Sequence, residues 1–382
     1  MLQLGYFDNA ATTLKKVPGL YEFIAQYMNE YGLNSGRGEY GAVRSTGKMV
    51  RDTRNVILKL LHADTRKEVV FCPSATIAIN TILRGLDINE GDNIYISHFE
   101  HNAVVRVLYD IQKKVKFNLE YLSLDAVSLK YNEQVIKAQF AIKKPKAVIV
   151  SQVSNVCGLV QPIDMLFKIA KEHNAITLAD AAQACGVIDT KLDNIDYYVF
   201  AGHKTLYAPF GIAGFVCSKS SQLKAFIYGG TGLDSANIEM PNAIPERFEA
   251  GSLNTMAIAG LNYSLKWILD KGVQSISIKE AENYNRLKDL LSTYDFVSFV
   301  GMGDNASAII SCKFKGYAPD EIGGILDGFG ILVRTGLHCA PMAHKFLNTF
   351  PEGTVRFSIS YFTEQDDFEQ LKKALDIIEE QM

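Results

Sequence analysis

Short runs of β-branched residues alternate with amphipathic stretches from about residue 43 to residue 260, and this alternation restricts the possible folds more than any other feature. Strands that alternate with helices of this length form βαβ units around a parallel sheet. The sequence therefore predicts an α/β fold with a mostly parallel sheet flanked by helices. The expected strands are 68–72, 93–97, 147–151, 175–179, 197–201 and 212–217. The expected helices are 49–61, 76–84, 104–113 and 163–173.

The pattern changes after residue 260 to a long helix, shorter strands and a final helix. Thr363 with Asp366 resembles a capping box at the start of that final helix. A chain of 382 residues is long enough for more than one domain. We predict a large domain at 15–260 and a smaller α+β domain formed by 1–14 and 261–382.

Composition excludes several classes of function. Lys and Arg number 39 against 42 Asp and Glu, so no basic excess indicates a nucleic-acid partner. No apolar stretch approaches the ~18 residues of a membrane span, and the first residues lack the pattern of a secretory signal. The six cysteines include no CxxC pair, which fits neither a disulfide scaffold nor a zinc site. We therefore expect a cytoplasmic protein with reduced thiols and no bound metal.

Polar residues directly follow most of the predicted strands. Ligands of an open parallel sheet bind beyond the carboxyl ends of its strands, so these residues are the candidates for a site. Each of them alone has an ordinary structural explanation, such as a helix cap or a core histidine. Together at one edge they predict a binding site. In chain order they are Ala75 and Thr76 at a helix start, His101, Asn155, Asp180, Gln183, His203 and Lys204.

This set of residue types matches the needs of pyridoxal 5′-phosphate. That coenzyme requires a lysine for a covalent bond, a carboxylate for its ring nitrogen and a cradle for its phosphate. Lys204 supplies the amine, and burial would lower its pKa and make it available. Asp180 supplies the carboxylate, while Ala75 and Thr76 offer N–H groups and a hydroxyl at a helix N-terminus.

The chain resembles the class V, fold-type I pyridoxal-phosphate enzymes, and within them the NifS/SufS-like cysteine desulfurases. The resemblance covers nearly the whole chain, and its specificity comes from the order of many short motifs. These motifs are 6–13, 75–76, 100–101, 154–158, 180–183, 201–204, 247–252, 334–340 and 356–358. The resemblance implies a homodimer that converts L-cysteine to L-alanine, as in iron–sulfur cluster assembly.

The resemblance also implies a role for each coenzyme-site residue. Lys204 binds the coenzyme covalently, His101 stacks on its ring and takes part in proton transfer, and Asp180 faces the ring nitrogen. Gln183 bonds the ring oxygen, and Asn155 lies near the ring and the substrate carboxylate. The phosphate shell is implied to consist of the backbone at Ala75, Thr76, His203 and, from the second subunit, the segment with Ser252.

Three residues near the C-terminus complete the implied site. Arg356, with Arg334, binds the substrate carboxylate, where a guanidinium suits a carboxylate better than an ammonium does. Cys339 attacks the substrate sulfur, becomes a persulfide and passes the sulfur to an acceptor protein. The sequence departs from the family at Ala201, where members usually carry a hydroxyl, and at 102–104, where a His-His-Ala-Asn run is more usual.

Three other functions remain open at this point. A selenocysteine lyase would use the same scaffold, because selenium replaces sulfur at the same bond. A class V aminotransferase would share Lys204 and Asp180 but leave Cys339 without a role. A non-catalytic scaffold is disfavoured, since all three of these residues are present.

Overall fold

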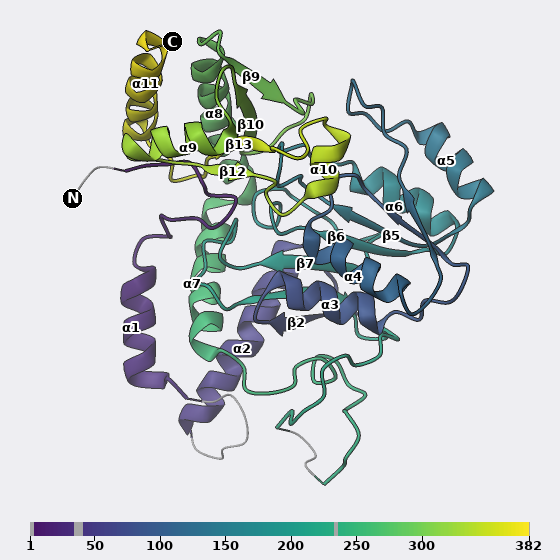
Figure 1. The fold of residues 1–382 in the computed structure, drawn as a ribbon. Helices are drawn as coiled ribbons and strands as arrows, with labels where there is room; N and C mark the ends of the chain where they lie inside the picture. Colours follow the sequence, from purple (N-terminus) through teal and green to yellow (C-terminus); the bar gives the residue numbers. More distant parts are fainter. Residues whose placement is uncertain (1–3, 34–40, 233–235, 382) are drawn as a thin grey trace.

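A computed structural model describes residues 4–33, 41–232 and 236–381, so residues 1–3 of the predicted small domain lie outside it (Figure 1). A seven-stranded sheet has the strand order β2-β8-β7-β6-β5-β3-β4. Within this sheet β8 is antiparallel to both neighbours, and the other neighbouring pairs are parallel. The prediction of a mostly parallel sheet is confirmed. Its strands are β2 (Lys67–Cys72), β3 (Asn93–Ile96), β4 (Asn118–Tyr121), β5 (Pro145–Ser151), β6 (Ile176–Asp180), β7 (Tyr197–Ala201) and β8 (Ala213–Ser218).

Strand β4 is the one strand of this sheet that the sequence did not predict. It lies at the edge of the sheet, and its four residues are exposed or only partly buried. An edge strand without a buried face carries no run of apolar residues, so its sequence gives little signal. The six predicted strands coincide with the other six to within two residues at each end.

Helices cover both faces of the sheet. Val69 and Phe71 of β2 point into one hydrophobic core, whereas Val70 and Cys72 point into the other, as the alternation of a strand requires. The first core lies against α2 (Gly41–Leu60), α5 (Glu133–Ile142), α6 (Ile163–Glu172) and α7 (Thr255–Lys271), and α1 (Leu20–Tyr31) contacts α7. The second core lies against α3 (Ala75–Gly85) and α4 (Asn102–Gln112).

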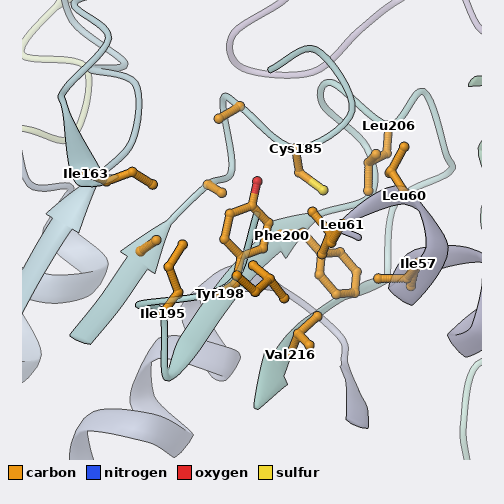
Figure 2. Packing of buried hydrophobic residues seen from close by; sticks show 14 of the residues in the cluster. Ile57, Leu60, Leu61, Ile163, Cys185, Ile195, Tyr198, Phe200, Leu206 and Val216 are labelled. Carbon is orange, nitrogen blue, oxygen red and sulfur yellow. The ribbon is translucent and has the colours of Figure 1, made fainter. Parts of the chain in front are cut away.

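The first core is the larger of the two. Figure 2 shows Tyr198 and Phe200 of β7 beside Val216 of β8, with Ile57 of α2 and Leu61, the residue after α2, packed nearby. These side chains are at most 1 % exposed. Such dense apolar packing holds the sheet rigid, so the loops at its carboxyl edge are presented from a fixed frame.

The C-terminal part contains a second, four-stranded antiparallel sheet in the order β12-β13-β10-β9 (Figure 1). The N-terminal strand β1 (Gly5–Tyr6) pairs with β11 (Ile331–Leu332), so the start of the chain joins this part. The predicted domain boundary at residue 260 falls within α7, whose apolar face packs into the larger core. This boundary stays a prediction. The other elements are α8 (Val273–Ser292), β9 (Val297–Val300), β10 (Ile309–Phe314), α9 (Pro319–Gly328), β12 (Arg334–Gly336), α10 (Pro341–Phe346), β13 (Thr354–Ser358) and α11 (Gln365–Glu380).

The cap of α11 differs from the prediction by one residue. The backbone N–H of Glu364 donates to Asp367 Oδ2 at 2.8 Å, so the reciprocal contact does not involve Thr363 and Asp366. Thr363 instead accepts a hydrogen bond from the Ser360 N–H through its hydroxyl at 2.9 Å. The Thr363 hydroxyl therefore stabilises the turn that precedes α11.

Candidate active site

Two adjoining cavities lie at the carboxyl edge of the seven-stranded sheet. The inner cavity has a volume of about 220 Å³ and includes Ala75, Thr76, His101, Asn155, Asp180, Gln183, His203 and Lys204 in its wall. The outer cavity has a volume of about 360 Å³ and includes His101, Asn155, Lys204, Arg334, Cys339 and Arg356. The structure therefore brings together every predicted site residue except Ser252, which lines neither cavity.

Lys204 lies in the turn after β7, in the wall that the two cavities share. A Cβ on Gly202 would come within 2.7 Å of the Ile212 carbonyl oxygen, so this turn requires glycine because of close packing. Burial lowers the pKa of Lys204 to about 8, although the nearby Asp180 carboxylate opposes that shift. At pH 7 a group with this pKa is ~10 % neutral, far more than an ordinary lysine.

Asp180 is the last residue of β6, a strand that lies between β5 and β7. Its Oδ1 accepts a hydrogen bond from the Ala182 N–H at 3.0 Å, which fixes the carboxylate at the cavity wall. Gln183 donates through Nε2 to the Ala10 carbonyl oxygen at 2.7 Å. The central position of β6 and these two bonds leave the polar groups little freedom to move.

His101 caps the N-terminus of α4. Its Nδ1 accepts a hydrogen bond from the Ala103 N–H at 3.0 Å. A ring whose Nδ1 acts as acceptor carries its proton on Nε2 in the neutral form. Burial lowers the pKa of His101, an effect that Asp180 partly offsets. The neutral imidazole is therefore held as an Nε2–H donor.

The N-terminus of α3 and His203 line the same part of the inner cavity and together could hold an anion. Ser74 accepts the Ile77 N–H at 3.3 Å, and the first N–H groups of a helix have no partner within it. Burial, followed by the charges of Lys204 and Lys16, lowers the pKa of His203 to about 4, so its ring is neutral. His203 Nδ1 is buried without a hydrogen-bond partner among the described residues. A buried polar atom of this kind indicates that a bound group completes the site.

Cys339 is presented to the outer cavity by a strained turn. His338 and Cys339 have φ values of +47° and +58°, which residues with a Cβ rarely adopt. Asn155 Nδ2 donates to the His338 carbonyl oxygen at 2.6 Å, and the Asn102 N–H donates to that of Cys339 at 2.7 Å. Cys339 is exposed, whereas the other five cysteines are free and buried. Backbone strain held by such bonds is typical of functional sites.

Arg356 of β13 is buried at the side of the outer cavity. Its Nη2 donates to Asp8 Oδ1 at 2.7 Å and its Nη1 to the Asn155 carbonyl oxygen at 2.9 Å. Arg334 is half-exposed, and its Nη1 lies 3.5 Å from Asp8 Oδ2. The two guanidinium groups thus share one carboxylate.

Sequence reasoning missed Asp8 and Phe210. Asp8 lies within a motif that carried the resemblance, but it contacts a residue 348 positions away, which no spacing rule could find. Phe210 lines the outer cavity, is 64 % exposed and stacks on the His203 ring at 4.6 Å between centroids. The available signal was its place six residues after Lys204, in the segment Ala208-Pro209-Phe210-Gly211.

The inner cavity fits pyridoxal 5′-phosphate in its donor set. This cavity is lined by the Lys204 amine, the Asp180 carboxylate, and the N-terminus of α3 with His203.

Among the described residues, no group of three or more His, Cys, Asp and Glu side chains could hold a metal ion. None of the helices described there is long and apolar enough to cross a membrane.

The family model for aminotransferase class-V matches residues 5–371. The chain therefore belongs to the aminotransferase class-V family. A probable cysteine desulfurase of Methanothermobacter thermautotrophicus is 28 % identical, with 98 % of this chain and 94 % of the relative covered. One from Halalkalibacterium halodurans is 29 % identical, with 98 % and 92 % covered.

Solved structures agree with this assignment. The apo structure of a cysteine desulfurase from Thermococcus onnurineus matches with a TM-score of 0.91 at 26 % identity, covering 99 % of this chain and 95 % of the other. A cysteine desulfurase from Escherichia coli matches with a TM-score of 0.85 at 22 % identity, covering 99 % and 95 %, a likeness of fold alone. The fold is that of the fold-type I pyridoxal-phosphate enzymes, as expected from the sequence.

Proposed function

We propose that this chain is a pyridoxal-phosphate-dependent cysteine desulfurase, which converts L-cysteine to L-alanine and carries the sulfur as a persulfide on Cys339. One observation carries the proposal. The exposed Cys339 lines the same cavity as Lys204, His101 and Arg356. An aminotransferase would have no use for a thiol held there in a strained turn.

Each residue has a role that follows from its surroundings. Lys204, Asp180 and the anion site at α3 would hold the coenzyme, which when bound supplies an electron sink for chemistry at the amino-acid carbon. Arg356 would bind the substrate carboxylate from a buried position. His101 would present its Nε2–H to the substrate, and the lowered pKa of Lys204 allows its amine to accept a proton near neutral pH.

The sulfur transfer balances without any further reactant. The Cys339 sulfur attacks the substrate sulfur, so an S–S bond forms as the substrate C–S bond breaks. The electron pair of that bond stays with the substrate carbon, which gains a proton to become the methyl group of alanine. Cysteine and thiol thus give alanine and persulfide with all atoms retained. The exposure of Cys339 would let an acceptor protein reach the persulfide.

We also propose a homodimer, in which the segment at Ser252 completes the phosphate site of the second copy. Gly251 and Ser252 are exposed and line neither cavity of their own chain. Large apolar side chains are exposed in the preceding loop, with Tyr228 73 % and Ile238 fully accessible. Exposed apolar groups of this kind are typical of a protein–protein interface.

The decisive experiment measures alanine and sulfide from L-cysteine for the wild type and for Cys339→Ala. We expect the variant to retain coenzyme colour and substrate binding but to lose sulfide release. Cys312→Ala is the matched control, because Cys312 is buried in the four-stranded sheet and lines neither cavity. Full sulfide release from Cys339→Ala would refute the persulfide role.

The same assay separates the other activities. Selenocysteine turnover that survives in Cys339→Ala would favour a selenocysteine lyase. Pyruvate-dependent transamination without sulfide release would favour an aminotransferase. A colourless protein that does not take up the coenzyme would indicate a non-catalytic scaffold.

A further inference from the structure

We propose that Glu100 is a positioning residue for His101, which ties the segment before α4 to the end of β5 through an uncharged carboxyl group. Glu100 is fully buried and lines neither cavity, whereas the next residue, His101, lines both. The inference rests on the proposed function, because it concerns the coenzyme that His101 is proposed to contact.

The carboxyl group of Glu100 joins the ends of two neighbouring strands. The Ser97 hydroxyl, directly after β3, donates to Glu100 Oε1 at 2.5 Å. Ser151, the last residue of β5, donates its N–H to the same oxygen at 2.7 Å, and its hydroxyl lies 2.9 Å from Oε2. Gln161 Nε2 connects the same two serines, with bonds to the Ser97 hydroxyl at 3.0 Å and the Ser151 carbonyl oxygen at 2.6 Å. The carboxyl group is therefore fixed within a closed, buried network.

This network fixes the backbone from which His101 projects. His101 has φ −68° and ψ 154°, an extended conformation in which successive side chains point to opposite sides. The Glu100 side chain accordingly lies in the interior, while the His101 ring faces the cavities. The following N–H, that of Asn102, donates to the Cys339 carbonyl oxygen at 2.7 Å. Three consecutive residues thus connect the interior, the cavity wall and the turn of Cys339.

The surroundings of Glu100 favour the uncharged form of its carboxyl group. Its hydrogen-bond partners are the serines Ser97 and Ser151, which carry no charge to balance a carboxylate. Burial and the nearby Asp180 carboxylate raise the pKa of Glu100 to about 8, although the bonds from the serines oppose the shift. A charge on Glu100 would also act on the buried Tyr131, whose pKa it raises. At pH 7 the group is therefore mostly protonated, and it holds its network by hydrogen bonds alone.

A double-mutant cycle on ligand affinity tests whether Glu100 acts through His101. Calorimetry measures the binding of pyridoxamine 5′-phosphate, because this amine form of the coenzyme cannot bond covalently to Lys204. We expect Glu100→Ala to weaken binding about tenfold in the wild-type background, but about twofold or less when His101 is already Ala. Glu100→Gln should bind within about twofold of the wild type, since its amide keeps the shape, the acceptor oxygen and the neutral charge.

Asn262→Ala is the matched control for the loss of a buried hydrogen bond. Asn262 of α7 donates to the Thr53 hydroxyl of α2 at 3.1 Å, is buried and lines neither cavity. This variant should be less stable in urea and bind the ligand as the wild type does. If Glu100→Ala does not fold, Ser97→Ala takes its place in the cycle, with an expected loss of about threefold, because it removes one of the three contacts of Glu100.

An equal loss of affinity with and without the His101 side chain would overturn the inference. An unchanged affinity in a folded Glu100→Ala would also overturn it, as would a Glu100→Gln protein that binds as weakly as the alanine variant. A wild type that does not bind pyridoxamine 5′-phosphate would have the same consequence. Sulfide release from L-cysteine by the wild type is measured alongside. Its absence would refute the proposed function, while the affinity cycle would still report on Glu100.

Discussion

At the scale of single residues, the site depends on side chains whose protonation the fold has shifted. Burial lowers the pKa of Lys204 to about 8 and that of His203 to about 4. The hydrogen bond from the Ala103 N–H to His101 Nδ1 holds the neutral His101 ring in its Nε2–H tautomer. The lowered pKa values increase the neutral fraction of the Lys204 amine near pH 7 and leave the His101 and His203 rings uncharged. The positive charge around the outer cavity therefore comes from Lys204, Arg334 and Arg356.

Replacement of the lysine provides a test at this scale. Lys204→Ala should fold, lose the yellow colour of the covalently bound coenzyme and reduce sulfide release from L-cysteine by about a thousandfold or more. Absorbance after gel filtration and the sulfide assay measure the two effects. Lys191→Ala, which removes an exposed lysine outside both cavities, should change neither. Retained colour in Lys204→Ala would contradict the assignment.

At the scale of elements, the proposed anion site depends on how α3 begins. The Ser74 hydroxyl accepts a hydrogen bond from the Ile77 N–H. Ala75 and Thr76 line the inner cavity, and their backbone N–H groups have no partner within the helix. The helix macrodipole adds a partial positive charge at the same point. The cap therefore contributes to stability and to the shape of the anion site together.

Two cap variants can separate these contributions. Ser74→Ala should lower the free energy of unfolding by about 1 kcal/mol and weaken coenzyme binding severalfold. Asn132 caps α5 through bonds to the Gln134 and Val135 N–H groups, away from both cavities. Asn132→Ala should cost a similar free energy of unfolding without any change in coenzyme affinity. Urea denaturation and coenzyme titration give the two quantities; equal coenzyme affinities for the two variants would argue against the anion site.

At the scale of the whole molecule, Glu280 links the turn after Lys204 to the segment after Arg356. This buried carboxyl group of α8 accepts the Tyr207 hydroxyl at 3.1 Å and the Tyr361 N–H at 3.2 Å. Burial raises the pKa of Glu280 to about 7, although both hydrogen bonds oppose the shift. The folded protein therefore holds this proton more tightly than the unfolded chain does.

The sign of the effect on stability follows from that difference. The contribution is fully present below the ordinary pKa of 4.5 and is lost as the pH rises through about 7. Glu280→Gln cannot titrate, so its free energy of unfolding should fall less between pH 4 and pH 8, by on the order of 3 kcal/mol. Denaturation across that range measures the difference between the two proteins. Parallel pH profiles would show that Glu280 does not titrate in the folded state.

The sequence by itself determined the α/β class, six strands of the larger sheet and most of the side chains at its edge. These features are local, because β-branched runs and strand ends can be read from neighbouring residues. The edge strand β4 was not predicted since it buries no face. The resemblance placed Cys339 and Arg356 in the same site, which periodicity alone could not have done.

Only the tertiary structure decided which residues from distant segments form an ion pair and which of them hold the strained turn. The pairing of Asp8 with Arg356 spans almost the whole chain. The strained turn of Cys339 is held by Asn155, in the turn after β5, and by Asn102, the first residue of α4. Such contacts depend on the way in which two distinct sheets meet, and no local pattern of residue types records that arrangement.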